Sequence, residues 1–159
     1  KQMQNDIQRK IVSVIVLNED GVLARVSGLF AGRGYNIESL TVCDIPGSKY
    51  SRMTIVTNSS KQVIEQIIKQ LNRLIPVYKI IEEDLIEKEM VLIKFSISSN
   101  LSDIDVLCRA YNGQVVNVSS KEVVAMVVDD ANRIENFIKV VQNYNPIEIV
   151  RGGAVAMQR

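Results

Sequence analysis

The order of apolar segments along this chain repeats, and the repeat limits the fold more than any other feature. Residues 8–84 predict strand, helix, strand, strand, helix and strand, in that order. The same order recurs about 80 residues later, over residues 88–157, although the residues themselves hardly match. Each βαββαβ series is typical of a four-stranded antiparallel sheet with both helices on one face. We therefore predict an α+β protein made of two ferredoxin-like domains.

Hydrophobic periodicity sets the elements of the first half. A dense apolar run at 10–17 indicates a buried strand, and a helix is predicted from Val22 to Arg33 with Leu23, Val26 and Phe30 on its apolar face. Ser60 and the two residues before it offer caps for a second helix. The other predicted elements are strands at 35–44, 49–57 and 77–81 and that second helix at 61–72.

The second half follows a charged stretch, residues 82–89, which we interpret as a connector. Ser102 and Asp103 are expected to cap its first helix, and Asn112-Gly113 to end it. The predicted elements are strands at 90–98, 114–118, 123–128 and 147–150, a helix to about residue 111, and a helix that carries Ile134, Phe137, Ile138 and Val141.

Composition excludes several classes of function. A net charge of +1 is unlike the basic surface of nucleic-acid-binding proteins, and no apolar run reaches the roughly 18 residues that span a bilayer. Neither a nucleic acid nor a membrane is an expected partner. The chain has no histidine, which removes Ser-His and Cys-His nucleophiles and leaves too few soft ligands for zinc. Cys43 and Cys108 lie in apolar segments, so we expect buried free thiols and a cytoplasmic protein.

A turn rich in Asn, Asp and Gly joins the first strand directly to the first helix. Backbone N–H groups at a helix start lack partners within the helix and favour anions. Gly21 permits a close approach to the backbone, and the amide of Asn18 can donate to a carboxylate or accept from an ammonium group. This chemistry suits a small zwitterion. An ordinary turn with Asp20 as the helix cap is the alternative.

A second turn, residues 33–36, ends the same helix and offers the amide of Asn36. Gly34 stands where a residue with positive φ is expected. The helix separates the two turns by roughly 15–18 Å, at about 1.5 Å per residue. One small ligand cannot touch Asn18 and Asn36 of the same chain. If both bind, a second protomer must supply its Asn36, which predicts a site at a dimer interface.

Other motifs have simpler explanations. Gly28, Gly32 and Gly34 do not form a nucleotide loop, because Ile37 stands where another glycine is needed and no Gly-Lys-Ser/Thr follows. We attribute Gly28 to close helix packing.

Two acidic pairs and one aromatic residue suggest weaker alternatives. Asp103 with Asp105, and Asp129 with Asp130, could bind Mg²⁺, but each pair lies at a predicted helix start, where carboxylates act as caps. RNA binding through sheet aromatics would need more than Tyr50 on the third strand.

Several segments of the chain form a pattern that covers nearly its whole length. They are Asn18-Glu19-x-Gly21-Val22-Leu23-x-Arg25-Val26-x-Gly28-Leu29-Phe30, Arg33-Gly34-Tyr35-Asn36-Ile37-Glu38-Ser39-Leu40-Thr41-Val42, residues 51–55 and 87–94, and more loosely 113–118 and 147–153. These segments resemble a known family, the bacterial acetolactate synthase (acetohydroxyacid synthase) regulatory small subunit. The dense part of the match covers the amino-terminal ACT domain of that family.

The resemblance implies a regulatory subunit with no catalysis and no cofactor of its own. Such a subunit binds the catalytic large subunit, raises its activity and confers feedback inhibition by valine in branched-chain amino acid biosynthesis. Thiamine diphosphate, Mg²⁺ and FAD belong to that partner. The resemblance also implies that the ACT domains of two chains form a homodimer. We expect the second domain mainly to associate with the enzyme. The implied valine contacts are Asn18, Gly21, Val22 and Leu23 of one protomer and Asn36 and Ile37 of the other.

Two other classes of function are competing hypotheses. A stand-alone ACT-type regulator of another enzyme or of transcription would need its own output, such as a DNA-binding helix pair or a basic face, and neither DNA-binding feature is evident. A small enzyme on this fold would need a nucleophile, base or metal cluster, and the absence of histidine argues against the commonest of these.

Overall fold

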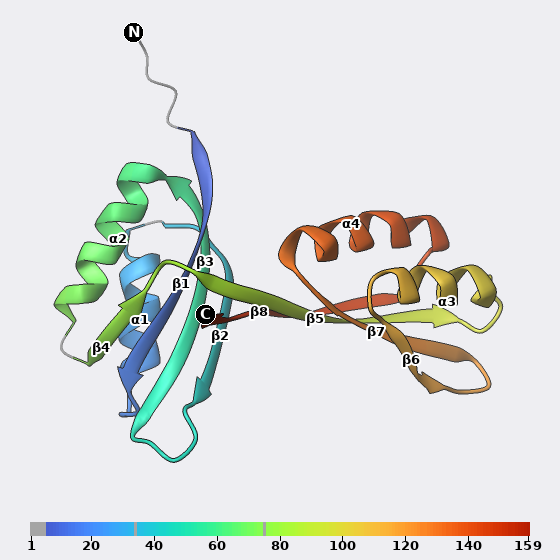
Figure 1. Ribbon diagram of the computed structural model, residues 1–159, viewed down its shortest axis with the longest axis horizontal. Coiled ribbons are helices and arrows are strands. Elements are labelled where there is room, and N and C mark those ends of the chain that lie inside the picture. The colour runs from blue at the N-terminus through green and yellow to red at the C-terminus, as the bar shows by residue number, and fades with distance from the viewer. Residues whose placement is uncertain (1–5, 34, 75) are drawn as a thin grey trace, which may run out of the picture. The chain divides into compact units, whose positions relative to one another are not determined.

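The computed structural model describes residues 6–33, 35–74 and 76–159 and divides into two compact units (Figure 1). The first unit comprises the described residues up to Ile86 together with Ala156–Arg159, and the second comprises Glu87–Val155. Among the helices of these residues, none is long and apolar enough to cross a membrane. Gly34, which we expected to have a positive φ, lies outside the described residues.

The first unit is a four-stranded sheet with two helices on one face (Figure 1). The strand order is β2-β3-β1-β4, and neighbouring strands are antiparallel. Alternate residues of the central strands β1 and β3, such as Val14 and Met53, pack against α1 and α2. The elements are β1 (Ile7–Leu17), α1 (Val22–Ala31), β2 (Ile37–Asp44), β3 (Tyr50–Ser60), α2 (Lys61–Arg73) and β4 (Val77–Ile81).

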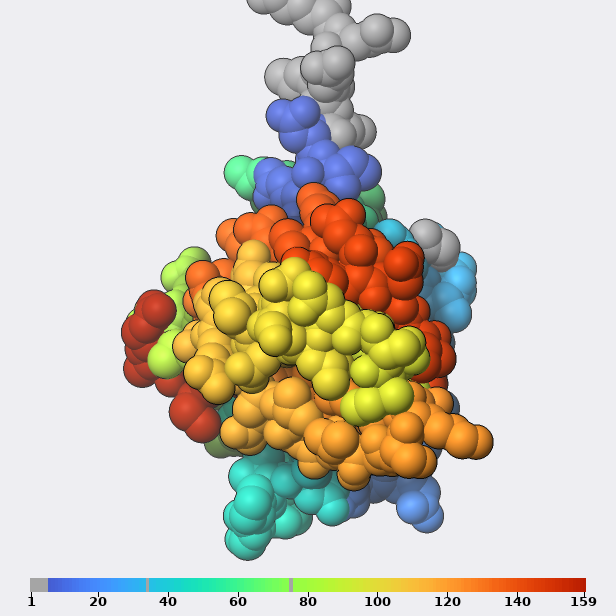
Figure 2. Space-filling model, turned by 90° about the vertical axis from the view of Figure 1, so that its right-hand side faces the viewer, coloured from blue at the N-terminus to red at the C-terminus, as the bar shows by residue number. Residues whose placement is uncertain are grey.

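The second unit repeats this architecture with the strand order β6-β7-β5-β8. Its core joins Ile93 and Val127 of the sheet to Phe137 of the last helix. The outer strand β6 is exposed along its whole length (orange in Figure 2). The elements are β5 (Leu85–Ser96), α3 (Leu101–Ala110), β6 (Gln114–Val118), β7 (Glu122–Asp129), α4 (Ala131–Val141), a short 3₁₀ helix η1 (Gln142–Tyr144) and β8 (Glu148–Gln158). The predicted α+β class, two βαββαβ ferredoxin-like folds, is confirmed.

The charged stretch at 82–89 is not the connector that we predicted, because β5 already begins at Leu85. Glu89 is buried in this strand, and its carboxylate accepts two hydrogen bonds from Arg151, at 2.7 and 3.0 Å. Arg151 also forms an ion pair with Glu135 at 2.9 Å. The hydrogen bond to Glu89, reinforced by the charges of both carboxylates, raises the pKa of Arg151. The buried carboxylate of Glu89 in β5 is therefore paired with an arginine 62 residues away in the sequence.

Three smaller predictions are also wrong. The last strand does not stop at Val150 but continues to Gln158, with Gly153 at a φ of 79°. The cap of α3 is Asn100, since the helix begins at Leu101, before Ser102 and Asp103. Cys43 is exposed near the end of the outer strand β2, whereas Cys108 is buried as expected.

Candidate amino-acid-binding site

The loop between β1 and α1 is fixed by the backbone of its neighbours. The N–H group of Asn18 donates to the carbonyl of Lys49 at 2.8 Å, and that of Glu19 donates to the carbonyl of Leu17 at 2.9 Å. Gly21 then adopts a φ of 80° and a ψ of 0°, the left-handed conformation that side chains disfavour. The chain therefore turns sharply at Gly21 and enters α1 at the next residue. This backbone conformation favours glycine at position 21.

The start of α1 is left without a side-chain cap. Its N-cap is Gly21, and no acidic residue occurs in its first turn. The alternative with Asp20 as the cap is therefore wrong. The N–H group of Val22 has only a long contact, 3.4 Å, to the carbonyl of Glu19. A Cβ atom placed on Gly21 would meet nothing within 4 Å, so the space in front of this turn is open. Backbone donors in such a place suit an anion.

The predicted residues at this helix start differ in what they offer to a ligand. Asn18 is exposed, so its amide is available. The side chain of Leu23 is 48% exposed and does not belong to the core, contrary to our assignment of it to the buried face of α1. Val22, in contrast, is only 5% exposed, because it packs in the core of the first unit. Only the backbone of Val22 can therefore contact a ligand.

Asn36 and Ile37 lie at the opposite end of α1, where the chain enters β2. Asn36 is exposed, and its carbonyl accepts a hydrogen bond from the hydroxyl of Thr57. Ile37 pairs with Thr57 across the β2–β3 ladder and packs partly against the core. The hydrogen bond from Thr57 holds the backbone of Asn36, and the side-chain amide of Asn36 takes no part in it.

A single protomer does not bring these two groups of residues to one ligand. The helix between them has 10 residues, which corresponds to about 15 Å. β2 is the outer strand of its sheet, so Ile37 and the residue before it lie at an edge of the unit. The described chain thus separates the two groups of predicted contacts, one at each end of α1.

The acidic pairs that suggested Mg²⁺ are engaged by other side chains. Asp103 bonds to Asn100, and Asp105 forms an ion pair with Arg109. Asp130 pairs with Lys88 at 2.7 Å, and Asp129 pairs with Arg133. The described residues contain no group of three or more His, Cys, Asp or Glu that could hold a metal ion.

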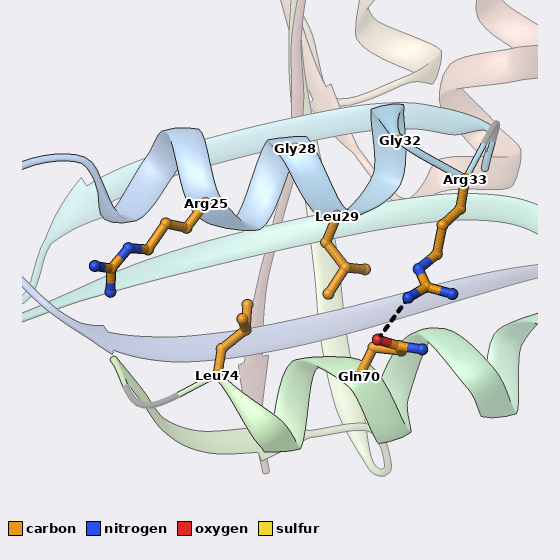
Figure 3. Close-up of a pocket in the computed structure, with 7 residues that line it drawn as sticks. All are labelled: Arg25, Gly28, Leu29, Gly32, Arg33, Gln70 and Leu74. Atoms are coloured by element: carbon orange, nitrogen blue, oxygen red, sulfur yellow. Dashed lines mark hydrogen bonds between the residues drawn. The ribbon is translucent and has the colours of Figure 1, made fainter.

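One feature that the sequence did not predict is a groove of about 550 Å³ between α1 and α2 (Figure 3). None of its lining residues is among the six predicted contacts. Gly28 lies in this groove, is exposed, and would have no atom within 4 Å of an added Cβ. Our interpretation of Gly28 as a close helix-packing residue is therefore wrong.

Comparison with known proteins covers both units. Residues 12–79 match the model of the acetohydroxyacid synthase (AHAS) small subunit-like ACT domain, and residues 88–159 match that of the small subunit of acetolactate synthase.

Individual relatives match over nearly their whole length. The acetolactate synthase small subunit of Buchnera aphidicola is 37% identical over 156 residues, covering 95% of this chain and 99% of the relative. A probable acetolactate synthase small subunit of Archaeoglobus fulgidus is 40% identical over 151 residues, covering 93% and 95%. The crystal structure of the acetolactate synthase small subunit from Thermotoga maritima superposes with a TM-score of 0.85 at 34% identity, covering 96% and 98% of the two chains. The chain belongs to the acetolactate synthase small subunit family.

Proposed function

We propose that this chain is the regulatory subunit of acetolactate synthase, which activates the catalytic large subunit and makes it sensitive to feedback inhibition by valine. Family membership supports the partnership with a large subunit. The open, uncapped start of α1 is the observation that carries the proposal of an amino acid ligand. Thiamine diphosphate, Mg²⁺ and FAD would be held by the large subunit, in the cytoplasm, and catalysis would take place there.

Valine would bind by three kinds of contact. Its carboxylate would accept hydrogen bonds from the backbone N–H groups of Val22 and Leu23, next to the positive end of the helix dipole. The amides of Asn18 and of Asn36 from a second protomer would hold the polar end. The isopropyl group would lie between the exposed side chain of Leu23 of one protomer and the partly buried Ile37 of the second protomer.

A homodimer is part of this proposal, because one chain separates its two partial sites by the length of α1. Pairing through the outer strand β2 and the neighbouring helix would bring the α1 start of one protomer to the Asn36 of the other. Valine would then change the equilibrium between two arrangements of the dimer. Only a difference in its affinity for the two arrangements can transmit a signal to the large subunit.

The decisive test is a valine titration of the reconstituted holoenzyme with Gly21→Asp. The new carboxylate would repel that of valine, and a side chain would enter the space that the ligand needs. We expect inhibition by valine to be lost while activation of the large subunit persists. Gly47→Asp is the matched control, because Gly47 also has a positive φ, 70°, and open space at its Cβ position. Unchanged inhibition of the Gly21 variant would refute the site.

Asn36→Ala tests the contribution of the second protomer. Because the Asn36 side chain is exposed and only its carbonyl bonds to Thr57, the variant should fold normally. Calorimetry should show valine binding weakened by about tenfold, the loss of one hydrogen bond to a charged group. Wild-type affinity in this variant would exclude the contact across the dimer.

A further inference from the structure

The groove between α1 and α2 is a second candidate for binding, separate from the two ends of α1 described above. It lies wholly within the first unit (Figure 3). Its lining residues are Arg25, Gly28, Leu29, Gly32, Arg33, Gln70 and Leu74.

The charges in this groove are of one sign. Arg25 and Arg33 are its ionised residues, and no Asp or Glu is found among its described lining residues. Arg33 donates a hydrogen bond to the neutral amide of Gln70 at 3.1 Å. Neither guanidinium forms an ion pair with a carboxylate that the structure describes. Five other arginines each pair with one, namely Arg9, Arg109, Arg133, Arg151 and Arg159.

Gly28 lines the groove and has no side chain to fill it. Glycine within a helix destabilises the fold relative to alanine, so an internal glycine calls for a reason. Packing inside the unit is not that reason, because a Cβ atom on Gly28 would point into open space. Without a side chain at this position, an occupant can approach the backbone of α1 closely.

The spacing of the groups along the groove indicates the shape of its occupant. Arg25 and Arg33 are eight residues apart, which is about 12 Å along a helix. Leu29 and Leu74 lie between the two guanidinium groups (Figure 3). The two guanidinium groups lie at opposite ends of the groove (Figure 3), so one small anion would not contact both in this arrangement of the side chains. An extended peptide covers about 12 Å in four residues.

We propose that this groove binds an acidic segment of the large subunit. Two carboxylates of that segment, about four residues apart, would pair with Arg25 and Arg33, and an apolar side chain between them would contact Leu29 and Leu74. The proposal rests on the proposed function, because it supplies a contact through which the two subunits associate. It differs from our expectation that the second domain mainly makes this association.

Charge reversal tests the proposal in the complete chain. Arg25→Glu and Arg33→Glu should each weaken binding to the large subunit by about tenfold or more in a calorimetric titration. Lys61→Glu is the matched control, because Lys61 is exposed at the start of α2 and does not line the groove. Affinity of the wild type should also fall between about 50 and 300 mM salt, where screening becomes strong. Variants that bind as tightly as the control would overturn the proposal.

A second variant keeps every charge and blocks the groove instead. Gly28→Phe places a ring in the open space above α1, and we expect normal folding together with weakened binding of the large subunit. Wild-type affinity of Gly28→Phe would also overturn the proposal.

Valine binding to the isolated small subunit should be unaffected in Gly28→Phe, which adds no charge near either end of α1. If the wild-type chain itself does not bind the large subunit, the proposed function fails as a whole. If the wild type binds and the groove variants bind equally well, only the groove is wrong.

Discussion

The helix that follows the first strand begins differently in the two units. In the first unit, α1 begins at Gly21 and has no side-chain cap. In the second unit, Asn100 caps α3: its side-chain oxygen accepts from the N–H group of Asp103 at 3.3 Å, and its amide donates to the Asp103 carboxylate at 2.9 Å. The start of the first helix is therefore open in the first unit, whereas a side chain of the protein itself occupies it in the second unit.

The turns after these helices differ in the same way. In the first unit, the side chain of Asn36 is exposed. In the second, the amide of Asn112 donates to the buried Asp129 at 3.4 Å, and Gly113 packs tightly against β7. The comparison teaches that the same architecture can leave the ends of a helix open or close them. Among the described residues, the first unit leaves both ends of its first helix exposed, whereas the second unit closes both ends of α3 with its own side chains.

The largest expected change in stability comes from Gly113→Ala, which adds a methyl group in the tightly packed turn after α3 in the second unit. The added Cβ atom would lie 2.6 Å from Cγ2 of Val127 and 2.7 Å from the carbonyl oxygen of Met126. Overpacking of this kind destabilises a protein by about 3 kcal/mol. Urea unfolding followed by circular dichroism would measure the loss, and hydrogen exchange should place it in the second unit. A loss below about 0.5 kcal/mol, the usual range for surface changes, would show that this turn is not tightly closed.

A smaller effect is expected from Asn100→Ala, which makes the start of α3 resemble that of α1. Removing an N-cap side chain lowers the free energy of unfolding by about 1 kcal/mol. Amide exchange in the first turn of α3 should accelerate, because the N–H group of Asp103 loses its acceptor. Asn100→Ser is the control, since its hydroxyl can also accept from the N–H group of Asp103 and it adds no charge beside the Asp103 carboxylate. Equal stability of the alanine variant and the wild type would contradict the proposed contrast.

Gly28→Ala should have a modest effect of the opposite sign. Alanine in an exposed helix stabilises by up to about 1 kcal/mol relative to glycine, and the new methyl group meets no atom within 4 Å. Thermal unfolding should therefore occur at a higher temperature. A lower temperature would mean that Gly28 has a packing role inside the unit. Together with Gly113→Ala, this variant separates a glycine required by packing from one that is not.

The smallest effect should be seen only in acid. Burial disfavours the charged form of Asp129, but hydrogen bonds from Arg133 and from the N–H group of Asp130, with the charges of Arg133 and Lys88, outweigh it and lower the pKa of this carboxyl. A pKa that is lower in the folded state stabilises the fold above the ordinary aspartate pKa, about 3.9. This stabilisation is lost as the pH falls through the lower, folded-state pKa.

Hydrogen exchange across this pH range measures the effect. Peptides of β7 and α4 should lose protection below about pH 4 in the wild type, more steeply than in Asp129→Asn. Peptides of β3 and α2 in the first unit serve as the internal reference. Identical pH profiles for the two proteins would show that Asp129 does not contribute.

Most of the fold could be predicted because local periodicity and turn residues determine where elements lie. Ser60 caps α2 as expected, since its hydroxyl accepts from the N–H group of Val63. The start of β5 could not be predicted, because Glu89 tolerates burial only through Arg151, 62 residues away. The continuation of β8 past Gly152 likewise depends on the neighbouring backbone: a Cβ there would lie 3.1 Å from the carbonyl oxygen of Met90.

The candidate site was predictable only in part. The turn chemistry of Asn18 and Gly21, and the length of α1, already indicated two partial sites in separate protomers. The exposure of Leu23 was not predictable, because helical periodicity places it next to the apolar face without saying where that face ends. The groove was missed for another reason. Arg25 and Gln70 come together through the packing of α1 against α2, and no local pattern encodes that contact.

The two thiols have a practical consequence for studying assembly. Burial, with a contribution from the charge of Asp105, raises the pKa of Cys108 to about 11, so this thiol stays protonated and unreactive at neutral pH. Cys43 is exposed on β2, the strand through which we expect protomers to pair. A maleimide fluorophore or spin label would therefore attach at one position without any engineered cysteine. Because pairing through β2 would cover Cys43, slower labelling at higher protein concentration, measured with and without valine, would report the association of protomers.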